Sequence, residues 1–347
     1  MPPTMSGVAG AHCDVSARDC VIAVAGASAD APPPGLDVTP DGCELRFITS
    51  REQLATEAAD ADVVFAWEPR RDWIEACWGW SPRLRWIAAA SAGVDYLMFP
   101  ALVLSDVVVT NSAGIFNDAM AEYALALVSA VCTDLPTTLR LQARREWVHR
   151  DTRRLAGSQV LVLGAGGIGR AIARLFNSVG ARASCVARTR RPDTQVGTIA
   201  GLAELPALLP AADFVVLALP LTGTTRGIIG AAELGLMRPD AWLVNLGRGE
   251  LVAESALVDA LTSEAIGGAA LDVFTQEPLP AAAPLWDLPN VIVSPHMSGD
   301  SRGWDKSLTS LFLAQLRRYR AGQPLTNVVD KDLGFIPGSS RGDQQPG

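Results

Sequence analysis

The sequence predicts an α/β fold in which parallel sheets are covered by helices on both faces. Its 347 residues suggest two domains, because domains of about 100–200 residues are usual. Short runs rich in β-branched residues alternate with longer Ala- and Leu-rich segments, which is the pattern of consecutive βαβ units. After an arginine-rich stretch this alternation begins again at residue 159, and the second series is long enough to form a complete doubly wound unit by itself.

The individual elements follow from local composition. A helix is expected at residues 118–133, which hold no Gly or Pro and have apolar residues at helical spacing, with Asn117 or Asp118 as its cap. An amphipathic helix is expected at residues 304–319, and the terminal residues 1–20 and 331–347 are expected to be mobile tails. Strands are expected at residues 21–25, 61–67, 86–89 and 107–111 in the first series, and at 159–163, 183–187, 214–218, 242–245, 269–272 and 291–293 in the second.

Composition excludes several classes of protein. With 49% hydrophobic and 19% charged residues the chain is not globally disordered, and its net charge of -8 argues against a general nucleic-acid binder. The sequence shows no secretory signal pattern and no apolar run of the roughly 18 residues that a membrane span needs, so no membrane partner is expected. The six cysteines form no CxxC pair, which argues against a metal site and favours a reduced, cytoplasmic protein.

Residues 164–169 read GAGGIG and match the GxGxxG pattern of dinucleotide-binding proteins. They follow the apolar run VLVL and precede an amphipathic segment, which is the strand–turn–helix context that gives the pattern its meaning. The glycines permit a tight turn, a close approach of a pyrophosphate to the backbone, and close packing of helix on strand. A glycine-rich structural turn is the alternative. The expected cofactor contacts are Gly164, Gly166, Gly167, Ile168 and Gly169.

The end of the following strand indicates which dinucleotide is bound. NAD-binding proteins place an acidic residue about 20 positions after the glycines, where it bonds the ribose 2′-hydroxyl. This chain has Ala187 there, followed by Arg188, Thr189, Arg190 and Arg191. Guanidinium groups bind a 2′-phosphate that a carboxylate would repel, so NADP(H) is expected to be preferred over NAD(H), with contacts from Arg188, Thr189 and Arg190. A solvated arginine turn is the alternative.

Three segments that follow later strands carry candidate catalytic side chains. Arg248 lies in NLGRG, Asp272 and Glu277 lie in LDVFTQEP, and His296 lies in SPH. The carboxyl ends of parallel strands meet at one edge of a sheet, so these residues could converge. The other two histidines lie in the N-terminal segment and in the arginine-rich stretch, which leaves His296 as the candidate acid–base group. A structural loop histidine is the alternative.

Taken together, these segments resemble the D-isomer-specific 2-hydroxyacid dehydrogenase family. The resemblance covers about residues 21–329. It includes, in the order found in the family, SAGVD at residues 91–95, AEYA at residues 121–124, the GxGxxG, NxxRG, LDVFxxEP and SPH. Several independent motifs in one order make this resemblance more specific than the glycine pattern alone.

The resemblance implies a role for each candidate. Arg248 would bind the carboxylate and keto oxygen of a 2-keto acid, because its planar charged fork suits such groups. His296 would be the general acid in reduction and the general base in oxidation. Glu277 would pair with His296 and raise its pKa by favouring the imidazolium. The remaining expected contacts are to the cofactor from Asp272, Pro220 and Thr225, and to the substrate carboxylate from the backbone amides of Ala92 and Gly93.

The architecture that the resemblance implies is a Rossmann domain inserted in a flavodoxin-like domain. Residues 21–112 and 298–330 would form the substrate-binding domain, and residues 113–297 the NADP-binding domain, with the substrate held in a cleft that closes to exclude water. Members of the family are commonly homodimers through the cofactor domain. We assign that contact to the helix at residues 118–133, for which a place in the core is the alternative.

Two local features resemble the glyoxylate/hydroxypyruvate reductase branch of the family. The AWEP stretch places Trp67 where a tryptophan of that branch borders the pocket, and the arginines that begin at Arg188 fit its preference for NADPH. We therefore expect the reduction of a small 2-keto acid to the D-2-hydroxy acid. A packing role is the alternative for Trp67. The alternative functions are a same-fold dehydrogenase for phosphoglycerate, a bulkier 2-keto acid or phosphite, and a dinucleotide-sensing, corepressor-like binding protein.

Overall fold

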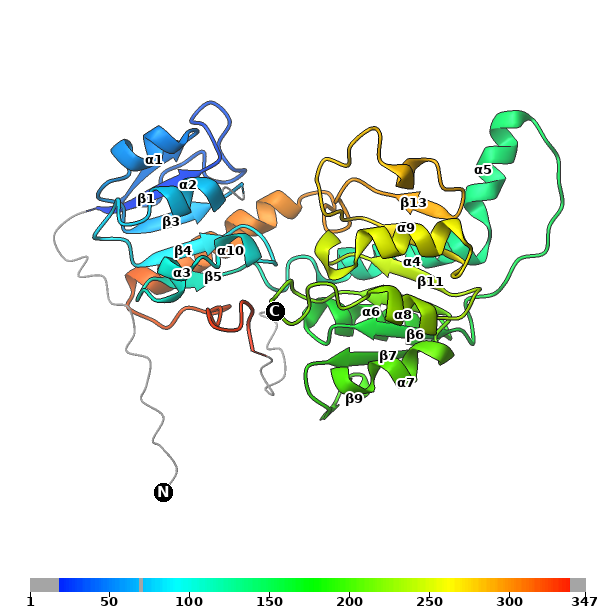
Figure 1. Ribbon diagram of the computed structural model, residues 1–347. Coiled ribbons are helices and arrows are strands. Elements are labelled where there is room, and N and C mark those ends of the chain that lie inside the picture. Colours follow the sequence, from blue (N-terminus) through cyan, green and yellow to red (C-terminus); the bar gives the residue numbers. More distant parts are fainter. Residues whose placement is uncertain (1–18, 69–70, 338–347) are drawn as a thin grey trace, which may run out of the picture. The chain divides into compact units, whose positions relative to one another are not determined.

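The computed structural model describes residues 19–68 and 71–337, which form two compact units. Unit 1 contains the described residues up to Ile115 and those from Gly303 onward, and unit 2 runs from Phe116 to Arg302. In sequence, unit 2 is therefore an insertion in unit 1, and the unit boundaries lie a few residues beyond those expected. Each unit is a largely parallel sheet with helices on both faces (Figure 1), which confirms the predicted fold class.

Unit 1 contains a parallel sheet with the strand order β2-β1-β3-β4-β5. Its strands are β1 Cys20–Ala25, β2 Cys43–Ile48, β3 Val63–Ala66, β4 Trp86–Ala89 and β5 Val108–Thr110. Its α-helices are α1 Arg51–Glu57, α2 Arg71–Ala76, α3 Pro100–Val103 and α10 Trp304–Arg320. The predicted strands and the closing helix are confirmed to within two residues at most ends, but β2 was not predicted.

Alternate residues of the central strands pack on opposite faces of the unit 1 sheet. On one face, the Phe65 ring of β3 stacks on Phe312 of α10 at 4.2 Å between centroids, and Trp86 of β4 lies 5.5 Å from the same ring. On the other face, Val64 and Ile87 join the apolar cluster to which the helices α1 and α2 contribute. A strand that is buried on both faces is apolar throughout, which explains why β3 and β4 are visible in the sequence as continuous apolar runs.

Unit 2 contains a sheet with the strand order β13-β12-β11-β10-β6-β7-β9-β8, parallel except for the β8–β9 pair. Its strands are β6 Gln159–Leu163, β7 Arg182–Ala187, β8 Arg191–Asp193, β9 Gly197–Gly201, β10 Phe214–Leu217, β11 Trp242–Asn245, β12 Gly268–Leu271 and β13 Val291–Val293. Its α-helices are α4 Asn117–Cys132, α5 Leu135–Arg144, α6 Gly167–Ser178, α7 Leu205–Leu208, α8 Ala231–Leu236 and α9 Glu254–Thr262. The short β8–β9 hairpin was not predicted.

Helix α4 is a core element of unit 2. Ala124 and Val128 are fully buried and belong to the same apolar cluster as Ile172 and Phe176 of α6. The predicted cap is wrong, because the helix begins after Phe116 and no side chain caps it. Among the described residues no single helix has the length and apolarity of a membrane span. The helices α4 and α5, which are bent by 63° where they meet, are long and apolar enough only when they are taken together.

The expected tails are shorter than predicted within the described part of the chain. Cys20 is the first residue of β1 and is buried. At the other end, the Lys331 ammonium donates hydrogen bonds to the carbonyl oxygens of Leu102, Ser105 and Val107. A charged group held by three carbonyls fixes the chain after α10 to unit 1, so the predicted tail is wrong for residues 331–337. Residues 1–18 and 338–347 lie outside the described residues.

Candidate active site

The candidate residues of unit 2 gather at the carboxyl edge of its sheet. Strands β6, β7, β10, β11, β12 and β13 are mutually parallel through their neighbours, so the loops that follow them leave the sheet at one edge. From β6 the chain adds β7 to β9 on one side of the sheet and then β10 to β13 on the other side. The boundary between β6 and β10 is therefore the switch point at which open α/β sheets bind ligands. These loops carry, in chain order, the GxGxxG, Arg188, Pro220, Arg248, Asp272 and Glu277, and His296.

Glu277 and His296 form the central polar contact of this edge. His296 Nδ1 lies 2.7 Å from Glu277 Oε2, and the other carboxylate oxygen of Glu277 accepts the Phe274 N–H at 2.9 Å. With both oxygens engaged, the carboxylate has a fixed orientation and so fixes the imidazole. The His296 side chain is 48% exposed, and the hydrogen bond at Nδ1 leaves Nε2, across the ring, as the atom that can face a substrate.

The pair shifts the pKa values of both partners in opposite directions. The hydrogen bond to Glu277 raises the pKa of His296 above its ordinary value, although burial and the charge of Arg248 act against it. Burial raises the pKa of Glu277, but the hydrogen bonds from His296 and Phe274 outweigh it and hold that pKa below its ordinary value. Both shifts favour an imidazolium beside a carboxylate, the state that a proton donor needs.

Asp272 holds the loop that carries His296. Its fully buried carboxylate accepts the Met297 N–H at 3.0 Å on Oδ1 and the Ser298 N–H at 2.9 Å on Oδ2, and it also accepts the Ser294 hydroxyl. His296 has a φ of 53°, a left-handed conformation that non-glycine residues rarely adopt. Donors on either side of His296 thus bind one carboxylate, which stabilises a backbone conformation that would otherwise be disfavoured. The predicted nicotinamide contact of Asp272 stays a prediction.

Tyr123 and Ser294 extend this network, and neither was predicted as a site residue. The hydroxyl of Tyr123, in α4, lies 2.5 Å from the Ser294 hydroxyl, which in turn donates to Asp272. Both residues lie inside motifs that the sequence analysis quotes, AEYA and SPH. Their polar side chains in otherwise apolar segments were the available signal, because a buried hydroxyl needs a partner.

Arg248 lies on a loop that packs against the Glu277 loop. Asn245 Nδ2 donates to the Arg248 carbonyl at 2.8 Å, and Asn245 Oδ1 accepts the Gly247 N–H at 3.1 Å, so the turn after β11 is held by the last residue of the strand. A Cβ on Gly249 would collide with the backbone of Phe274. Glycine at this position therefore lets the two loops touch, which places Arg248 close enough to influence the pKa of both His296 and Glu277.

The GxGxxG loop fits a dinucleotide. Gly164 has a φ of 119°, and a Cβ there would collide with the Ala218 carbonyl, while a Cβ on Gly169 would collide with the Gly164 carbonyl. These two glycines thus serve the turn and the close packing of α6 on β6. Gly166, which precedes α6, has open space where its Cβ would be. The N-terminus of a long helix beside open space is suited to a pyrophosphate, because unpaired N–H groups and the helix dipole face it.

The arginine loop after β7 is exposed. Arg188, Thr189 and Arg190 are exposed, and the Arg190 guanidinium pairs with Glu204. Glu204 also accepts the Gly201 N–H at 2.8 Å, so Arg190 is tied to the turn that follows β9. The predicted contacts of Arg188, Thr189 and Arg190 with a 2′-phosphate stay predictions.

Two further predicted residues contact each other after β10. Thr225 is buried, and its hydroxyl donates to the Pro220 carbonyl at 2.7 Å and accepts the Thr222 N–H at 2.8 Å. The loop at residues 220–225 is therefore held by its own hydrogen bonds. It begins just after Ala218, and Gly164 of the glycine loop packs closely on the Ala218 carbonyl, so the two loops are neighbours.

Comparison with known proteins agrees with this geometry. The family model described as D-isomer specific 2-hydroxyacid dehydrogenase, NAD binding domain, matches residues 125–298. The chain belongs to the D-isomer-specific 2-hydroxyacid dehydrogenase family. It is an NAD(P)-dependent oxidoreductase, as the motifs predicted.

Several relatives of this dehydrogenase are glyoxylate reductases. The present chain is 34% identical to the glyoxylate reductase of Thermococcus gammatolerans over 234 residues, which cover 65% of this chain and 70% of that protein. An NADPH-dependent glyoxylate/hydroxypyruvate reductase from Sinorhizobium meliloti, solved with NADP and sulfate, has a TM-score of 0.80 at 27% identity and covers 92% of this chain and 100% of its own. A family member from Xanthobacter autotrophicus, solved with NADPH, has a TM-score of 0.75 at 30% identity and covers 92% of this chain and 100% of its own.

The predicted substrate contacts of the dehydrogenase in unit 1 follow the carboxyl ends of β3 and β4. The carbonyls of Ala92 and Gly93 accept hydrogen bonds from Asn111 Nδ2 at 2.6 Å and Ser91 Oγ at 2.7 Å. Within residues 19–68 and 71–337, the amides of Ala92 and Gly93 donate no hydrogen bond, so they are available to an anion. Trp67 stacks on Trp304 at 6.5 Å between centroids, a contact that its packing interpretation also explains.

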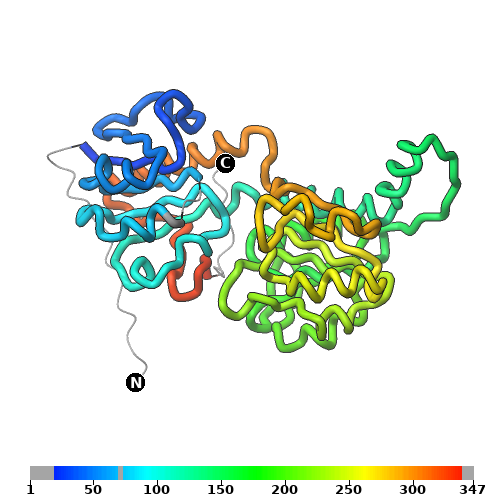
Figure 2. Tube along the Cα trace, turned by 45° about the horizontal axis from the view of Figure 1, so that its top comes forward, coloured from blue at the N-terminus to red at the C-terminus, as the bar shows by residue number. Residues whose placement is uncertain are grey.

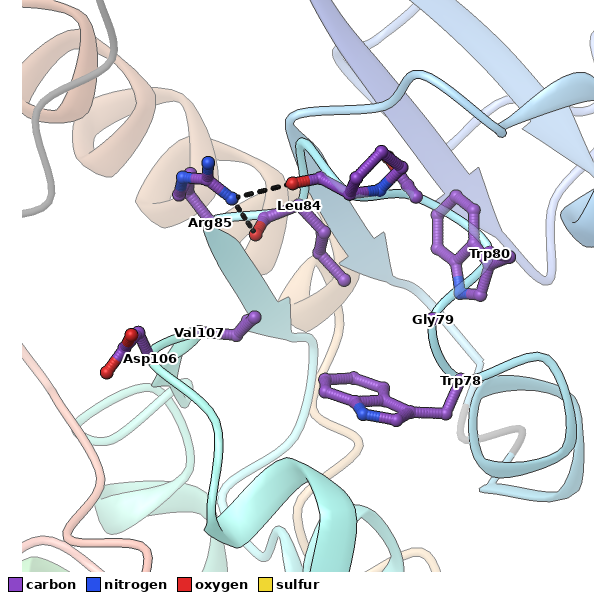
Figure 3. Close-up of a pocket in the computed structure, with 9 residues that line it drawn as sticks. Trp78, Gly79, Trp80, Leu84, Arg85, Asp106 and Val107 are labelled. Carbon is purple, nitrogen blue, oxygen red and sulfur yellow. Dashed lines mark hydrogen bonds between the residues drawn. The ribbon is translucent and has the colours of Figure 1, made fainter.

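Two cavities lie in unit 1, and the first of them is at the opposite edge of that sheet. Their volumes are about 410 and 580 Å³, and both are lined by Trp78, Gly79 and Trp80. Figure 3 shows the first, which Leu84 and Val107 also line. These two residues precede β4 and β5, whereas the predicted substrate contacts follow the strands, and none of the predicted site residues lines either cavity.

Proposed function

We propose that this dehydrogenase uses NADPH to reduce a small 2-keto acid of the glyoxylate/hydroxypyruvate type to the D-2-hydroxy acid. The observation that carries the proposal is the 2.7 Å contact between His296 Nδ1 and Glu277 Oε2, with the Arg248 loop packed alongside. A 2-keto acid presents a carboxylate and a polarised carbonyl, which are the groups that a guanidinium and an imidazolium recognise.

In the proposed mechanism, Arg248 binds the carboxylate and keto oxygen of the substrate. His296 Nε2 donates its proton to the keto oxygen, and Glu277 stabilises the imidazolium before that transfer. When bound, NADPH supplies the hydride that the carbonyl carbon accepts, so the product carries one new C–H and one new O–H bond. Asp272 and Ser294 act as positioning residues, because they fix the backbone around His296. The substrate contacts of Trp67, Ala92 and Gly93 in unit 1 stay part of the proposal.

The preference for NADPH rests on the arginine loop. The chain has no acidic residue at Ala187 or in the three residues after it. Arg188 is exposed in the loop after β7, and β7 is the sheet neighbour of β6, the strand that the glycine loop follows. We assign Arg188 and Thr189 to the 2′-phosphate, with Arg190 contributing through its loop. The glycine-loop residues, Pro220 and Thr225 are proposed to contact the rest of the cofactor.

A panel of substrates tests the proposed function. Oxidation of NADPH and NADH is followed by absorbance with glyoxylate, hydroxypyruvate, pyruvate, a bulkier 2-keto acid and 3-phosphohydroxypyruvate, and reduction of NADP⁺ is followed with phosphite. The highest kcat/KM is expected for glyoxylate or hydroxypyruvate with NADPH. Preference for one of the other substrates would assign the chain to that activity instead. Tight dinucleotide binding without turnover of any substrate would favour the corepressor-like sensor.

A homodimer through unit 2 is the proposed assembly, and the cytoplasm is the proposed location. The face of α4 that is turned away from the core stays a candidate for the contact, and the segment after α4 offers a second one. Figures 1 and 2 show α5 and the chain after it projecting from the rest of unit 2. Leu139 of α5 is 55% exposed, Trp147 is 100% exposed and Val148 is 53% exposed. An apolar arm of this kind is costly in water unless a second copy covers it.

Light scattering tests the assembly. The wild type is expected to have the mass of a dimer, and the double variant Leu139→Ser, Trp147→Ser that of a monomer. Val179→Ser, at an exposed apolar position at the end of α6, is the matched control and should remain dimeric. A monomeric wild type, or a double variant that stays dimeric, would contradict the proposed contact.

A further inference from the structure

Two cysteines lie opposite each other in the sheet of unit 1. Cys20 is the first residue of β1 and Cys43 is the first residue of β2, and the register of these parallel strands pairs them directly. Neighbouring strands are about 4.8 Å apart, which is within the Cα separation of roughly 4.4–6.8 Å that a disulfide spans. Paired residues point to the same face. The two thiols are hydrogen-bonded to each other, and no disulfide joins them.

Arg320, in the last turn of α10, provides a positive charge beside this pair. Its guanidinium donates to the Asp41 carbonyl and to the Cys43 thiol. The hydrogen bond from Cys20, helped by the charge of Arg320, lowers the pKa of Cys43 to about 7, although burial and Asp19 act in the other direction. The fully buried Cys185 in unit 2 behaves in the opposite way, since burial raises its pKa to about 12. The charge beside Cys43 thus distinguishes it from an ordinary buried cysteine.

We propose that Cys20 and Cys43 form a dithiol site that a peroxide converts reversibly into a disulfide. The site is separate from the residues of the proposed reduction, and it requires no turnover of the enzyme. Cys43 is 7% exposed and Cys20 is 1% exposed, so a small oxidant reaches Cys43 first and Cys20 is shielded from direct attack. Cys43 is therefore the attacking thiol, and Cys20 is the resolving thiol.

The chemistry has two balanced steps. The Cys43 thiolate attacks the peroxide, the O–O bond breaks, an S–O bond forms, and the leaving alkoxide or hydroxide takes a proton. Cys20 then attacks the sulfenic acid, the S–O bond breaks, an S–S bond forms, and water leaves with the Cys20 proton. Two thiols are oxidised and one peroxide is reduced. An added dithiol reverses the change by exchange.

Mass spectrometry of the peroxide-treated protein tests the site. Trypsin cuts after Arg18 and Arg46, and the peptide 19–46 contains Cys20 and Cys43 and no other cysteine. After limited peroxide treatment, alkylation of remaining thiols and digestion, we expect this peptide two hydrogens lighter and unalkylated, and restored by dithiothreitol. The peptides with Cys132 and Cys185 should remain alkylated and serve as internal controls.

Variants separate the two roles without reference to activity. In Cys20→Ser, the sulfenic acid at Cys43 has no resolving thiol and should be trapped by dimedone. In Cys43→Ser, Cys20 should show little dimedone adduct. Arg320→Gln should slow the disulfide severalfold, and Arg320→Lys, which keeps the charge, should slow it less. The proposal is overturned if peptide 19–46 keeps two alkylated thiols while Cys77 is oxidised, if Cys43 goes directly to the sulfinic acid, or if Cys13 supplies the partner.

Discussion

Two loops at the same edge of the unit 2 sheet differ in what holds them. The loop with His296 is fixed by the protein, since Asp272 accepts hydrogen bonds from residues on both sides of the histidine and Glu277 orients its ring. The loop with Arg188 is exposed, and the contact that holds Arg190 is a pair with Glu204 at the surface. The difference teaches that the residue proposed as the acid–base group is held by the protein itself, whereas the residue proposed to select the cofactor faces water.

The largest effect is expected at the fixed loop. His296→Asn should lower kcat for reduction by about 10²–10⁴-fold, which is the usual contribution of a positioned general acid. Affinity for NADPH, measured by fluorescence titration, should stay within a few-fold of the wild type, because the histidine lies apart from the glycine loop in sequence and strand position. His149→Asn, an exposed histidine, is the control. If the variant retains most of the wild-type kcat, His296 is not the proton donor.

The next effect is expected at the exposed loop. Arg188→Asp should lower the ratio of kcat/KM for NADPH to that for NADH by roughly 10- to 100-fold, since a charge-assisted hydrogen bond of about 1.5–3 kcal/mol is lost. Thermal stability should change little, because the side chain is exposed. Arg182→Asp, at the opposite end of β7, controls for charge alone. An unchanged ratio would favour the alternative interpretation, in which the arginines form a solvated turn and do not contact the cofactor.

A smaller and pH-dependent effect is expected for Glu277→Gln. The hydrogen bond to Glu277 raises the pKa of His296, so its loss should lower that pKa. Reduction needs the imidazolium and therefore should fail at a lower pH in the variant, while oxidation needs the neutral ring and should extend to lower pH. Rates in both directions across a pH series check the sign. A profile that matches that of the wild type and of the control Glu264→Gln would argue against the pairing.

The smallest effect is expected for Ser294→Ala. The variant removes one of the donors to Asp272 and the partner of Tyr123, but leaves the backbone donors of Met297 and Ser298 in place. A lost hydrogen bond of about 1 kcal/mol should lower the Tm by about 2–4 °C in a unit of this size. The kcat should fall severalfold with little change in KM, as expected for a positioning residue. Ser263→Ala, at an exposed helix end, should change neither quantity.

Much of the fold could be predicted from local pattern. The strands β4, β6, β11 and β13 begin and end where predicted, because parallel strands buried on both faces are short apolar runs between turns. The strand β2 has the sequence CELRFI, in which Arg46 bonds to Glu44 and Asp60. An edge strand with one solvent-exposed face has charged side chains on that face, so its composition does not distinguish it from a loop.

The candidate site could be predicted in part. Arg248, Glu277 and His296 are recognisable because each lies in a distinct motif after a strand, and the pairing of Glu277 with His296 is present in the structure. The network of Tyr123, Ser294 and Asp272 was not foreseen, since its members are far apart in the chain and each is an ordinary polar residue in its own segment. Only folding brings the Ser294 hydroxyl to the buried Asp272 carboxylate and the Tyr123 hydroxyl to Ser294.

The sequence by itself determined the parallel architecture, the dinucleotide loop and the family, because these depend on spacing within short segments. The tertiary structure decided which residues from distant segments meet. It buried one face of α4 in the core and left Trp147 exposed on the arm after α5. It also set Cys20 against Cys43, and tied Lys331 to three carbonyls in a segment expected to be a tail. These outcomes rest on contacts between residues distant in sequence, which no local pattern records.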